Sequence, residues 1–299
     1  MGIVAPFLSR GRSAPSRGAR AVVTGAGSGI GRAFAIELAK RGGEVICADI
    51  DKGRADATVQ TISRIYGAKA HAFFCDVGRR ADVESLALHA ELIFDGPATL
   101  VINNAGVGIG GKPVGDIGLD DWKWALDINL WGVVHGCETF APQLRAGHGG
   151  VINVASAAGF AAAPMMAPYN VSKAAVVSLS ETMAAELRRH GVTVTVLCPT
   201  FVKTNVARDG RITPQSSTLA EALMRWTGYT PENVAKMTLD AHDAGRLYVL
   251  PQLDARLVWH LKRHFPAQYT YFLSLLPRLL PDGTADEKAS SADAERTGV

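Results

Sequence analysis

Residues 21–31 read Ala21-Val22-Val23-Thr24-Gly25-Ala26-Gly27-Ser28-Gly29-Ile30-Gly31. The first four are apolar or β-branched, which is typical of a buried strand. The glycines that follow permit a tight turn, because glycine tolerates backbone angles that other residues avoid. An apolar run with helical periodicity then occupies residues 30–40. We therefore expect a strand, a glycine turn and a helix in immediate succession.

Short apolar runs of this kind recur along the chain and alternate with longer helical segments. The expected strands are residues 21–24, 44–49, 70–76, 99–103, 150–156, 192–198 and 246–250. The run from Val192 to Leu197 is apolar or β-branched throughout, which indicates burial on both faces of a sheet. The pattern predicts an α/β fold with a doubly wound, Rossmann-type parallel sheet of about seven strands and helices on both faces.

The chain has 299 residues, which suits one α/β domain with extensions at its ends. We expect this catalytic domain over residues 20–251, amphipathic helices over residues 252–281 and a disordered polar tail over residues 282–299. Residues 1–19 are rich in arginine and serine and contain no acidic residue. We expect them to form a disordered basic leader, with a mitochondrial presequence as the alternative.

Composition argues against several kinds of partner and site. The net charge is only +3 and the basic excess lies in the first twenty residues, which argues against a nucleic-acid-binding face. No apolar run is long enough for a membrane-spanning helix. Cys47, Cys75, Cys137 and Cys198 form no Cys-x-x-Cys pair, so we expect reduced, buried thiols. We expect no metal site and a cytoplasmic protein.

The glycine turn predicts a binding site for a dinucleotide. Glycines let the backbone approach a pyrophosphate, whose charge is favoured by the amino terminus of the next helix. The expected contacts in the turn are Gly25, Ser28, Gly29, Ile30 and Gly31.

Asp49 ends the second expected strand, where a carboxylate accepts hydrogen bonds from ribose hydroxyls and repels a 2′-phosphate. This predicts NAD rather than NADP. The alternative role for Asp49 is to cap the next helix, which Asp51 can do instead.

Two further strand ends carry candidate cofactor contacts. Asp76 and Val77 close the third expected strand, where Asp76 meets the adenine amino group or caps the next helix. Asn103-Asn104-Ala105-Gly106 closes the fourth, and we expect Asn103, Ala105 and Gly106 to contact the cofactor. Ligands bind sheets of this type outside the carboxyl ends of the strands.

Tyr169 and Lys173 stand four residues apart, so a helix places both side chains on one face. A phenol is a poor base at neutral pH, because its pKa is about 10. A neighbouring ammonium favours the phenolate, and we expect Lys173 to lower the pKa of Tyr169 in this way.

The ordered set of motifs resembles the short-chain dehydrogenase/reductase family, in its single-domain branch. The resemblance covers residues 20–251 and rests on Thr24-Gly25-x-x-x-Gly29-x-Gly31, Asn103-Asn104-Ala105-Gly106, Asn129, Ser156, Tyr169, Lys173 and Pro199. It implies a Rossmann-type sheet and hydride transfer between a nicotinamide and an alcohol or carbonyl.

The resemblance implies a role for each catalytic residue. Ser156 would hold the substrate oxygen and Tyr169 would be the general acid and base. Lys173 would favour the tyrosinate and bind the nicotinamide ribose. Asn129, within an expected helix over residues 119–144, would hold a water that links Lys173 to solvent.

The resemblance also places Pro199 and Thr204 at the nicotinamide end of the cofactor. The family usually has glycine after this proline, but this chain has Thr200. Because threonine lacks the conformational freedom of glycine, we expect the loop to differ here.

The substrate is expected to be apolar. No charged residue occurs in the loop of residues 157–168, and Val107, Phe201 and Trp226 are further candidates for the lining. A small hydrophobic alcohol or ketone fits this composition. Met165 and Met166 either line the pocket or pack beneath the loop.

Residues 254–280 combine apolar residues at helical spacing with Arg256, Lys262, Arg263 and Arg278. We expect these helices to pack on their own or a neighbouring subunit; peripheral membrane contact is the alternative. The resemblance implies a homodimer or homotetramer. Its contacts would include Ala174, Ala175, Val177, Leu179 and Met183, which could instead face only the sheet.

The leading hypothesis is an NAD-dependent dehydrogenase of a hydrophobic secondary alcohol. An NADP-dependent ketoacyl or carbonyl reductase is the enzymatic alternative. A dinucleotide-binding regulator without turnover is the alternative outside enzymes.

Overall fold

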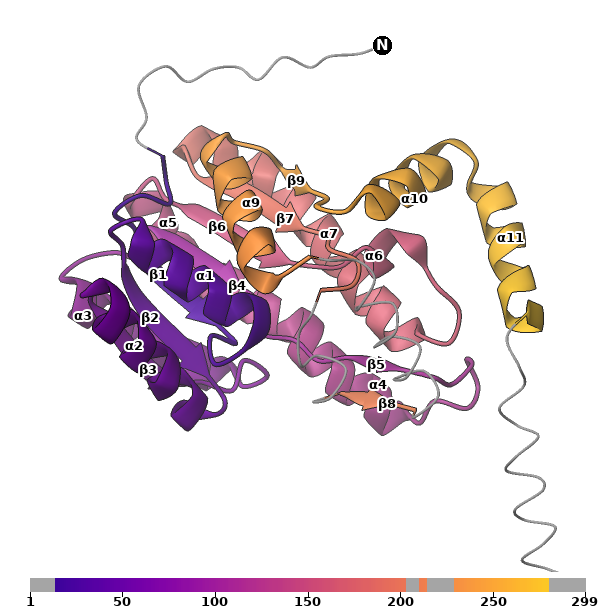
Figure 1. Cartoon of the computed structure of the whole chain (residues 1–299), viewed down its shortest axis with the longest axis horizontal. Helices are drawn as coiled ribbons and strands as arrows, with labels where there is room; N and C mark the ends of the chain where they lie inside the picture. Colours follow the sequence, from indigo (N-terminus) through magenta and orange to yellow (C-terminus); the bar gives the residue numbers. More distant parts are fainter. Residues whose placement is uncertain (1–13, 203–209, 214–228, 280–299) are drawn as a thin grey trace, which may run out of the picture.

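The computed structural model describes residues 14–202, 210–213 and 229–279. At its centre, a seven-stranded parallel sheet has the strand order β3-β2-β1-β4-β6-β7-β9 (Figure 1). These strands are β1 (Arg20–Thr24), β2 (Glu44–Asp49), β3 (Ala70–Phe74), β4 (Leu100–Asn103), β6 (Gly150–Val154), β7 (Thr193–Leu197) and β9 (Tyr248–Val249). A separate pair joins β5 (Ile109–Gly110) to β8 (Arg211–Ile212).

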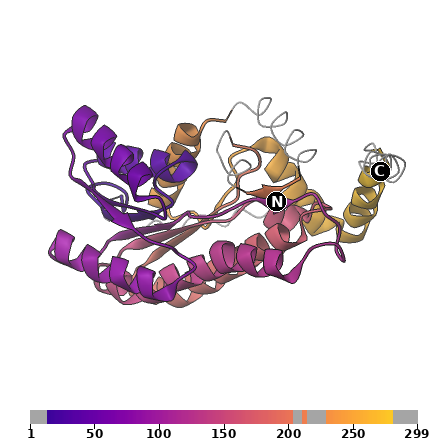
Figure 2. The same ribbon diagram turned by 90° about the horizontal axis from the view of Figure 1, so that it is seen from below.

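Helices cover both faces of the sheet, as the sequence predicts (Figure 2). One face carries α1 (Gly29–Lys40), α2 (Lys52–Tyr66) and α9 (Pro231–Asp243); the other carries α3 (Arg80–Phe94), α5 (Gly132–Ala146) and α7 (Ala167–Leu187). The other helical segments are α4 (Leu119–Leu126), η1 (Asp127–Trp131), α6 (Ala158–Ala161), η2 (Arg188–His190), α10 (Leu253–His264) and α11 (Pro266–Leu279).

Two apolar layers explain why the strands are apolar throughout. Val22 packs into the layer formed with α3, α5 and α7, while Val23 packs into the layer formed with α1, α2 and α9. In β2, Ile46 packs into the first of these layers and Val45 into the second. Successive side chains of a strand point to opposite faces, so a sheet covered on both sides needs apolar residues at every position. The predicted doubly wound sheet is confirmed.

Local signals account for several helix ends. The Asp51 side chain accepts a hydrogen bond from the Arg54 N–H at 3.1 Å and caps α2. Gly67 follows α2 with a left-handed φ of 59°, which glycine adopts without strain. Thr230 caps α9 in a similar way.

Some predicted boundaries were wrong. β3 ends at Phe74 rather than at residue 76, and β9 covers only Tyr248–Val249. The expected helix over residues 119–144 is interrupted by the π-helical turn η1. A π-helical turn is rare and confined to one turn of a helix, and the expected helix did not include it.

The described part of the chain begins in contact with the domain, before the predicted start at residue 20. Ser16 is fully buried, and its N–H and hydroxyl donate to the Asp243 carboxylate at 2.8 and 2.7 Å. Residues 1–13 and 280–299 lie outside the described residues, so the disordered leader and tail stay predictions.

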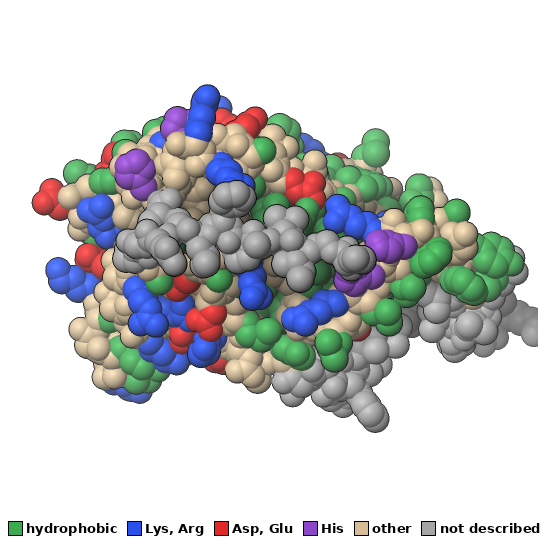
Figure 3. Space-filling model, turned by 90° about the horizontal axis from the view of Figure 1, so that it is seen from above, with side chains coloured by type: hydrophobic (Ala, Val, Ile, Leu, Met, Phe, Trp, Pro, Cys, Tyr) green, Lys and Arg blue, Asp and Glu red, His purple; other side chains and the backbone are tan. Residues whose placement is uncertain are grey.

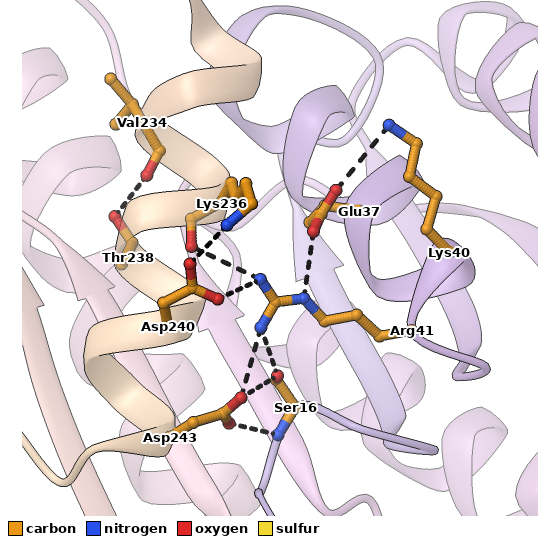
Figure 4. Close-up of polar contacts among 9 residues, drawn as sticks. All are labelled: Ser16, Glu37, Lys40, Arg41, Val234, Lys236, Thr238, Asp240 and Asp243. Carbon is orange, nitrogen blue, oxygen red and sulfur yellow. Dashed lines mark hydrogen bonds and ion pairs between the residues drawn. The ribbon is translucent and has the colours of Figure 1, made fainter.

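Arg41 joins this segment to α1 and α9 (Figure 4). Its guanidinium donates to Glu37 at 3.1 Å, to Asp240 at 2.7 Å and to Ser16 at 2.8 Å. It also lies 3.3 Å from the Asp243 carboxylate. The Arg41 side chain is only 9% exposed, so these interactions are poorly screened by water.

The four cysteines are free and buried, which confirms the prediction of reduced thiols. Burial raises the pKa of each thiol to about 12. None of the helices in the described ranges is long and apolar enough to cross a membrane.

We expect Arg41→Ala to lower the free energy of unfolding by about 2–4 kcal/mol, because it leaves buried groups of Ser16 and Asp243 without their cation. The control is Lys236→Ala, which removes an exposed partner of Asp240 and should cost less than about 1 kcal/mol. Urea denaturation measures both. Equal losses in the two variants would contradict a special role for Arg41.

Candidate active site

The predicted site residues converge on one edge of the sheet. Because the strands are parallel, their carboxyl ends all lie at this edge. The glycine turn follows β1, Asp49 ends β2, and Ser156 and Pro199 follow β6 and β7. β1 lies between β2 and β4, where the strand order reverses direction, and ligands of doubly wound sheets bind at such a point.

The glycine turn is held against the end of β4. The Asn104 side chain donates to the Thr24 carbonyl at 2.9 Å, and Thr24 Oγ1 accepts from the N–H groups of Asn104 and Ala105 at 3.0 and 3.1 Å. A Cβ at Gly31 would lie 2.2 Å from the Gly25 carbonyl oxygen, so no side chain fits there. The first turn of α1 contains no acidic residue. The turn therefore fits the pyrophosphate of a dinucleotide.

Asp49 faces this turn. Its Oδ2 accepts from the Gly27 N–H at 2.8 Å, and its Oδ1 accepts from the Asp51 N–H at 2.9 Å. A Cβ at Gly27 would lie 2.8 Å from Oδ2, which explains the glycine. Asp51 caps α2, so the alternative role of Asp49 as that cap does not occur. Each carboxylate oxygen keeps a lone pair for a ribose hydroxyl.

Asp76 and Val77 lie just beyond β3. Asp76 Oδ1 accepts from the Gly78 N–H at 3.0 Å. Arg79, rather than Asp76, is the residue at the start of α3, so the alternative of a helix cap was wrong. Val77 is buried, and its carbonyl accepts from His135 Nδ1 at 2.9 Å. The adenine contact of Asp76 stays a prediction.

Asn103 and Asn104 have different environments. Asn103 is 2% exposed, and its side chain donates to Asn153 Oδ1 at 2.9 Å, within the helix layer of α5 and α7. Its side-chain amide therefore does not reach the glycine turn, and the contact of Asn103 with the cofactor stays a prediction. The side chain of Asn104, which is not among the expected cofactor contacts, makes the connection to the glycine turn. The alternation of side chains along a strand is the signal that could have separated the two.

Ser156 and Tyr169 meet at the centre of the site. The Ser156 hydroxyl lies close enough to the Tyr169 phenol to lower its pKa. Ser156 Oγ also donates to the Pro199 carbonyl at 3.3 Å and accepts from the Ala158 N–H at 3.2 Å. Ser156 is buried, so its hydroxyl is held in place by the segments that follow β6 and β7.

Lys173 lies on the same face of α7 as Tyr169, as the spacing predicts. Its Nζ is 5.8 Å from the centre of the Tyr169 ring and donates to the Val154 carbonyl at 3.0 Å. Burial lowers the pKa of Lys173 to about 8. Burial also raises the pKa of Tyr169, and the Ser156 hydroxyl opposes this effect. The expected lowering of the Tyr169 pKa is therefore not found, because desolvation dominates.

Asn129 is fully buried in the π-helical turn η1. Its side chain accepts from the Val107 N–H at 2.8 Å and donates to the Val107 carbonyl at 2.9 Å. A Cβ at Gly106 would lie 3.0 Å from Asn129 Oδ1 and 3.4 Å from Lys173 Nζ. Asn129 Oδ1 and Lys173 Nζ thus both lie beside Gly106, close to the same point. The water-holding role of Asn129 stays a prediction.

Thr200 occupies the place where the family pattern has glycine. Its φ is not in the positive region that favours glycine. Its N–H donates to Gln252 Oε1 at 3.2 Å, and its hydroxyl donates to Asp254 Oδ1 at 3.2 Å. No local sequence pattern connects Gln252 with this loop. Thr204 and Trp226 lie outside the described residues.

The region beside Tyr169 where the substrate is expected combines apolar and charged groups. Met166 lies against Gly110, while Met165 is 41% exposed. A cavity of about 250 Å³ opens beside Pro168, the neighbour of Tyr169. The cavity is lined by Ile109, Gly110, Lys112, Ile117, Asp121, Pro168, Gly210, Arg211, Ile212 and Thr213. Arg211 and Asp121 form an ion pair at 2.7 Å, so their charges largely offset each other.

Comparison with known proteins agrees with this geometry. The family model for short chain dehydrogenases matches residues 19–214. SadH of Mycobacterium tuberculosis is 33% identical over 257 residues, which cover 83% of this chain and 91% of SadH. Galactitol 2-dehydrogenase of Rhizobium johnstonii is 36% identical over 229 residues, which cover 74% of this chain and 87% of that protein.

A solved short-chain dehydrogenase/reductase from Burkholderia phymatum, in complex with NAD, has 35% identity and a TM-score of 0.78. The likeness covers 84% of this chain and 94% of that one. The matched region includes the glycine turn and every described residue of the predicted catalytic set. This chain therefore belongs to the short-chain dehydrogenase/reductase family of NAD(P)-dependent oxidoreductases.

Proposed function

We propose that this protein transfers a hydride between NAD and a hydrophobic secondary alcohol or ketone, with Ser156, Tyr169, Lys173 and Asn129 as its catalytic set. One observation carries the proposal. The Ser156 hydroxyl acts on the Tyr169 phenol and lowers its pKa, and both lie beside a buried lysine at the sheet edge that also holds the glycine turn. A regulator without turnover has no use for this arrangement.

The nicotinamide, when bound, supplies the chemistry of hydride transfer to or from the substrate carbon. Ser156 would hold the substrate oxygen, and Tyr169 would exchange a proton with it. In reduction the phenol gives its proton to the ketone oxygen, so that a neutral alcohol forms. In oxidation the alcohol proton returns to Tyr169.

The raised pKa of Tyr169 bears on the direction of this exchange. At neutral pH the side chain is a phenol, which is the form that reduction of a ketone requires. Lys173 has a pKa of about 8, so it is largely protonated at neutral pH. Its charge lies where it can stabilise the phenolate that forms when Tyr169 gives up its proton.

We expect Tyr169→Phe to lower turnover by about 100- to 10,000-fold, because it removes the group that exchanges the proton. Binding of NAD should stay near that of the unmodified protein. Tyr66→Phe is the control, since it makes the same chemical change at a surface position 40% exposed. Turnover is followed by NADH absorbance. Full activity of Tyr169→Phe would reject Tyr169 as the acid and base.

The substrate proposal rests on the uncharged loop of residues 157–168 and on the apolar part of the cavity beside Pro168. Galactitol 2-dehydrogenase is named for a polar substrate, so a test panel needs galactitol beside aliphatic, aromatic, terpenoid and steroid alcohols. A clear preference for galactitol would replace the apolar proposal with a polyol.

The preference for NAD rests on Asp49, whose carboxylate lies at the glycine turn. We expect the unmodified protein to prefer NAD, and Asp49→Ala to reduce this preference by about tenfold or more through loss of the repulsion between its carboxylate and a 2′-phosphate. Asp51→Ala is the control, because it removes the cap of α2 and leaves Asp49 in place. Steady-state kinetics with both cofactors measures the ratio.

A preference of the unmodified protein for NADP would support the alternative, an NADP-dependent ketoacyl or carbonyl reductase. The homodimer or homotetramer stays a prediction. Of its expected contacts, Ala174 is exposed on α7, whereas Val177 and Met183 are buried.

The outer face of α10, together with Phe265 just after it, favours contact with an anionic membrane. Leu257, Leu261 and Phe265 are 61%, 42% and 55% exposed. Figure 1 shows α10 and α11 projecting from the body, and Figure 3 shows hydrophobic side chains over that end with cations beside them. Residues 255–281 contain no acidic residue. A symmetric contact with a second copy would therefore bring like charges together, whereas anionic lipid complements them.

We expect the protein to sediment with vesicles that contain phosphatidylserine and to stay in solution with phosphatidylcholine alone. The double variant Leu257→Ser, Leu261→Ser should weaken binding about tenfold or more, through loss of apolar burial. Leu92→Ser on α3 is the control, at a position 81% exposed. Equal binding by both variants would reject this surface.

A further inference from the structure

Two short segments hold the hydroxyl of Ser156. One is the start of the loop after β7, where the Pro199 carbonyl accepts from Ser156 Oγ at 3.3 Å. The other is the start of α6, where the Ala158 N–H donates to Ser156 Oγ at 3.2 Å. The Ala157 N–H also donates to the Pro199 carbonyl at 2.9 Å, so the two segments are joined. Whatever fixes these segments also fixes Ser156.

Gln252 fixes the loop after β7. It is 2% exposed, and its amide bridges two neighbouring backbone groups. Oε1 accepts from the Thr200 N–H at 3.2 Å, and Nε2 donates to the Phe201 carbonyl at 3.2 Å. These two residues directly follow the carbonyl that holds Ser156. Removing the amide would leave two backbone groups without these partners, which is costly in a buried place.

The hydroxyl of Thr200 adds a second link to the same helix. It donates to Asp254 Oδ1, which also accepts from the Ala255 N–H at 2.8 Å at the start of α10. The residue that departs from the family pattern is thus used by an element beyond the usual core of the family.

Trp259 and Tyr269 fix the other segment. The Trp259 ring meets Phe160 of α6 edge to face, with ring centres 5.1 Å apart. The guanidinium carbon of Arg263 lies 4.4 Å from the centre of the Trp259 ring, and the centre of the Tyr248 ring lies 4.9 Å from it. The Tyr269 hydroxyl donates to the Ala161 carbonyl at 2.9 Å. Aromatic pairs of this geometry favour one relative orientation, so α6 is held in position as well as covered.

We propose that residues 252–269 form a strap that holds Ser156 in position against Tyr169, with Gln252 and Trp259 as positioning residues. The strap contacts both segments that bind the Ser156 hydroxyl. None of these contacts involves the glycine turn or Asp49. The strap's role rests on the proposed function, because Ser156 must hold the substrate oxygen for its position to matter. The inner residues Gln252 and Trp259 then act on catalysis through Ser156, whereas exposed residues of the same segment take no part.

The test is Gln252→Leu in the full-length protein, assayed with NAD and the best alcohol of the panel. We expect kcat to fall about 10- to 100-fold, because a small displacement of Ser156 disturbs the geometry of the reacting groups. The dissociation constant for NAD should change little. Leu257→Ser, on the exposed face of the same helix, is the control and should retain full kcat.

A double variant separates positioning from a general loss of stability. In a Ser156→Ala background, Gln252→Leu should cause no further fall in kcat, because the group it positions is already absent. If Gln252→Leu lowers kcat by the same factor with and without Ser156→Ala, the strap proposal is overturned. Full activity of Ser156→Ala would instead overturn the role of Ser156 in the proposed function, so the two failures are distinguishable.

Hydrogen exchange gives a readout without turnover. Gln252→Leu should speed exchange in peptides that cover residues 156–163 and 199–202, while β1 to β3 stay unchanged. Trp259→Phe, which keeps an aromatic ring against Phe160, should retain more kcat than Trp259→Ala. If exchange near Ser156 is unaffected by Gln252→Leu, or if Trp259→Phe is as impaired as Trp259→Ala, the strap does not position Ser156.

Discussion

The parallel pairing of seven strands is the constraint on which the rest of this structure depends. It brings the carboxyl ends of the strands to one edge of the sheet, so residues as distant in the chain as Thr24 and Asn104 can form a hydrogen bond. That contact holds the glycine turn in place, and the Gly27 N–H of the turn donates to the Asp49 carboxylate. The cofactor side of the site thus follows from sheet register, which two buried apolar layers enforce.

Burial, more than the charge of its neighbour, governs the acid and base properties of Tyr169. The ammonium of Lys173 is near enough to act on the ring, but it is itself buried and its pKa falls. Both residues are therefore held closer to their neutral forms than the sequence spacing suggested. In the proposed reaction this favours donation of a proton by Tyr169, with the lysine charge stabilising the phenolate that forms.

Stability and catalysis are organised at different places in this chain. Arg41 ties the first described residues to α1 and α9, far from the strand ends that carry the proposed catalytic groups. The segment after β9 instead lies beside the proposed site. Its inner residues contact the loops around Ser156, and its outer face is apolar and exposed. The same segment can therefore position site residues with its inner side and present an apolar surface with its outer side.

The sequence alone determined the fold and much of the site, because both depend on short-range patterns. Continuous apolar strands, the glycine turn, Asp51 as a cap and the spacing of Tyr169 and Lys173 are all visible within a few residues. Tertiary structure decided what depends on neighbours distant in sequence: that Asn104 rather than Asn103 faces the glycine turn, that desolvation raises the Tyr169 pKa, and that Gln252 holds the loop at Thr200. Burial and long-range hydrogen bonds exist only once the chain is folded, so local pattern carries no signal for them.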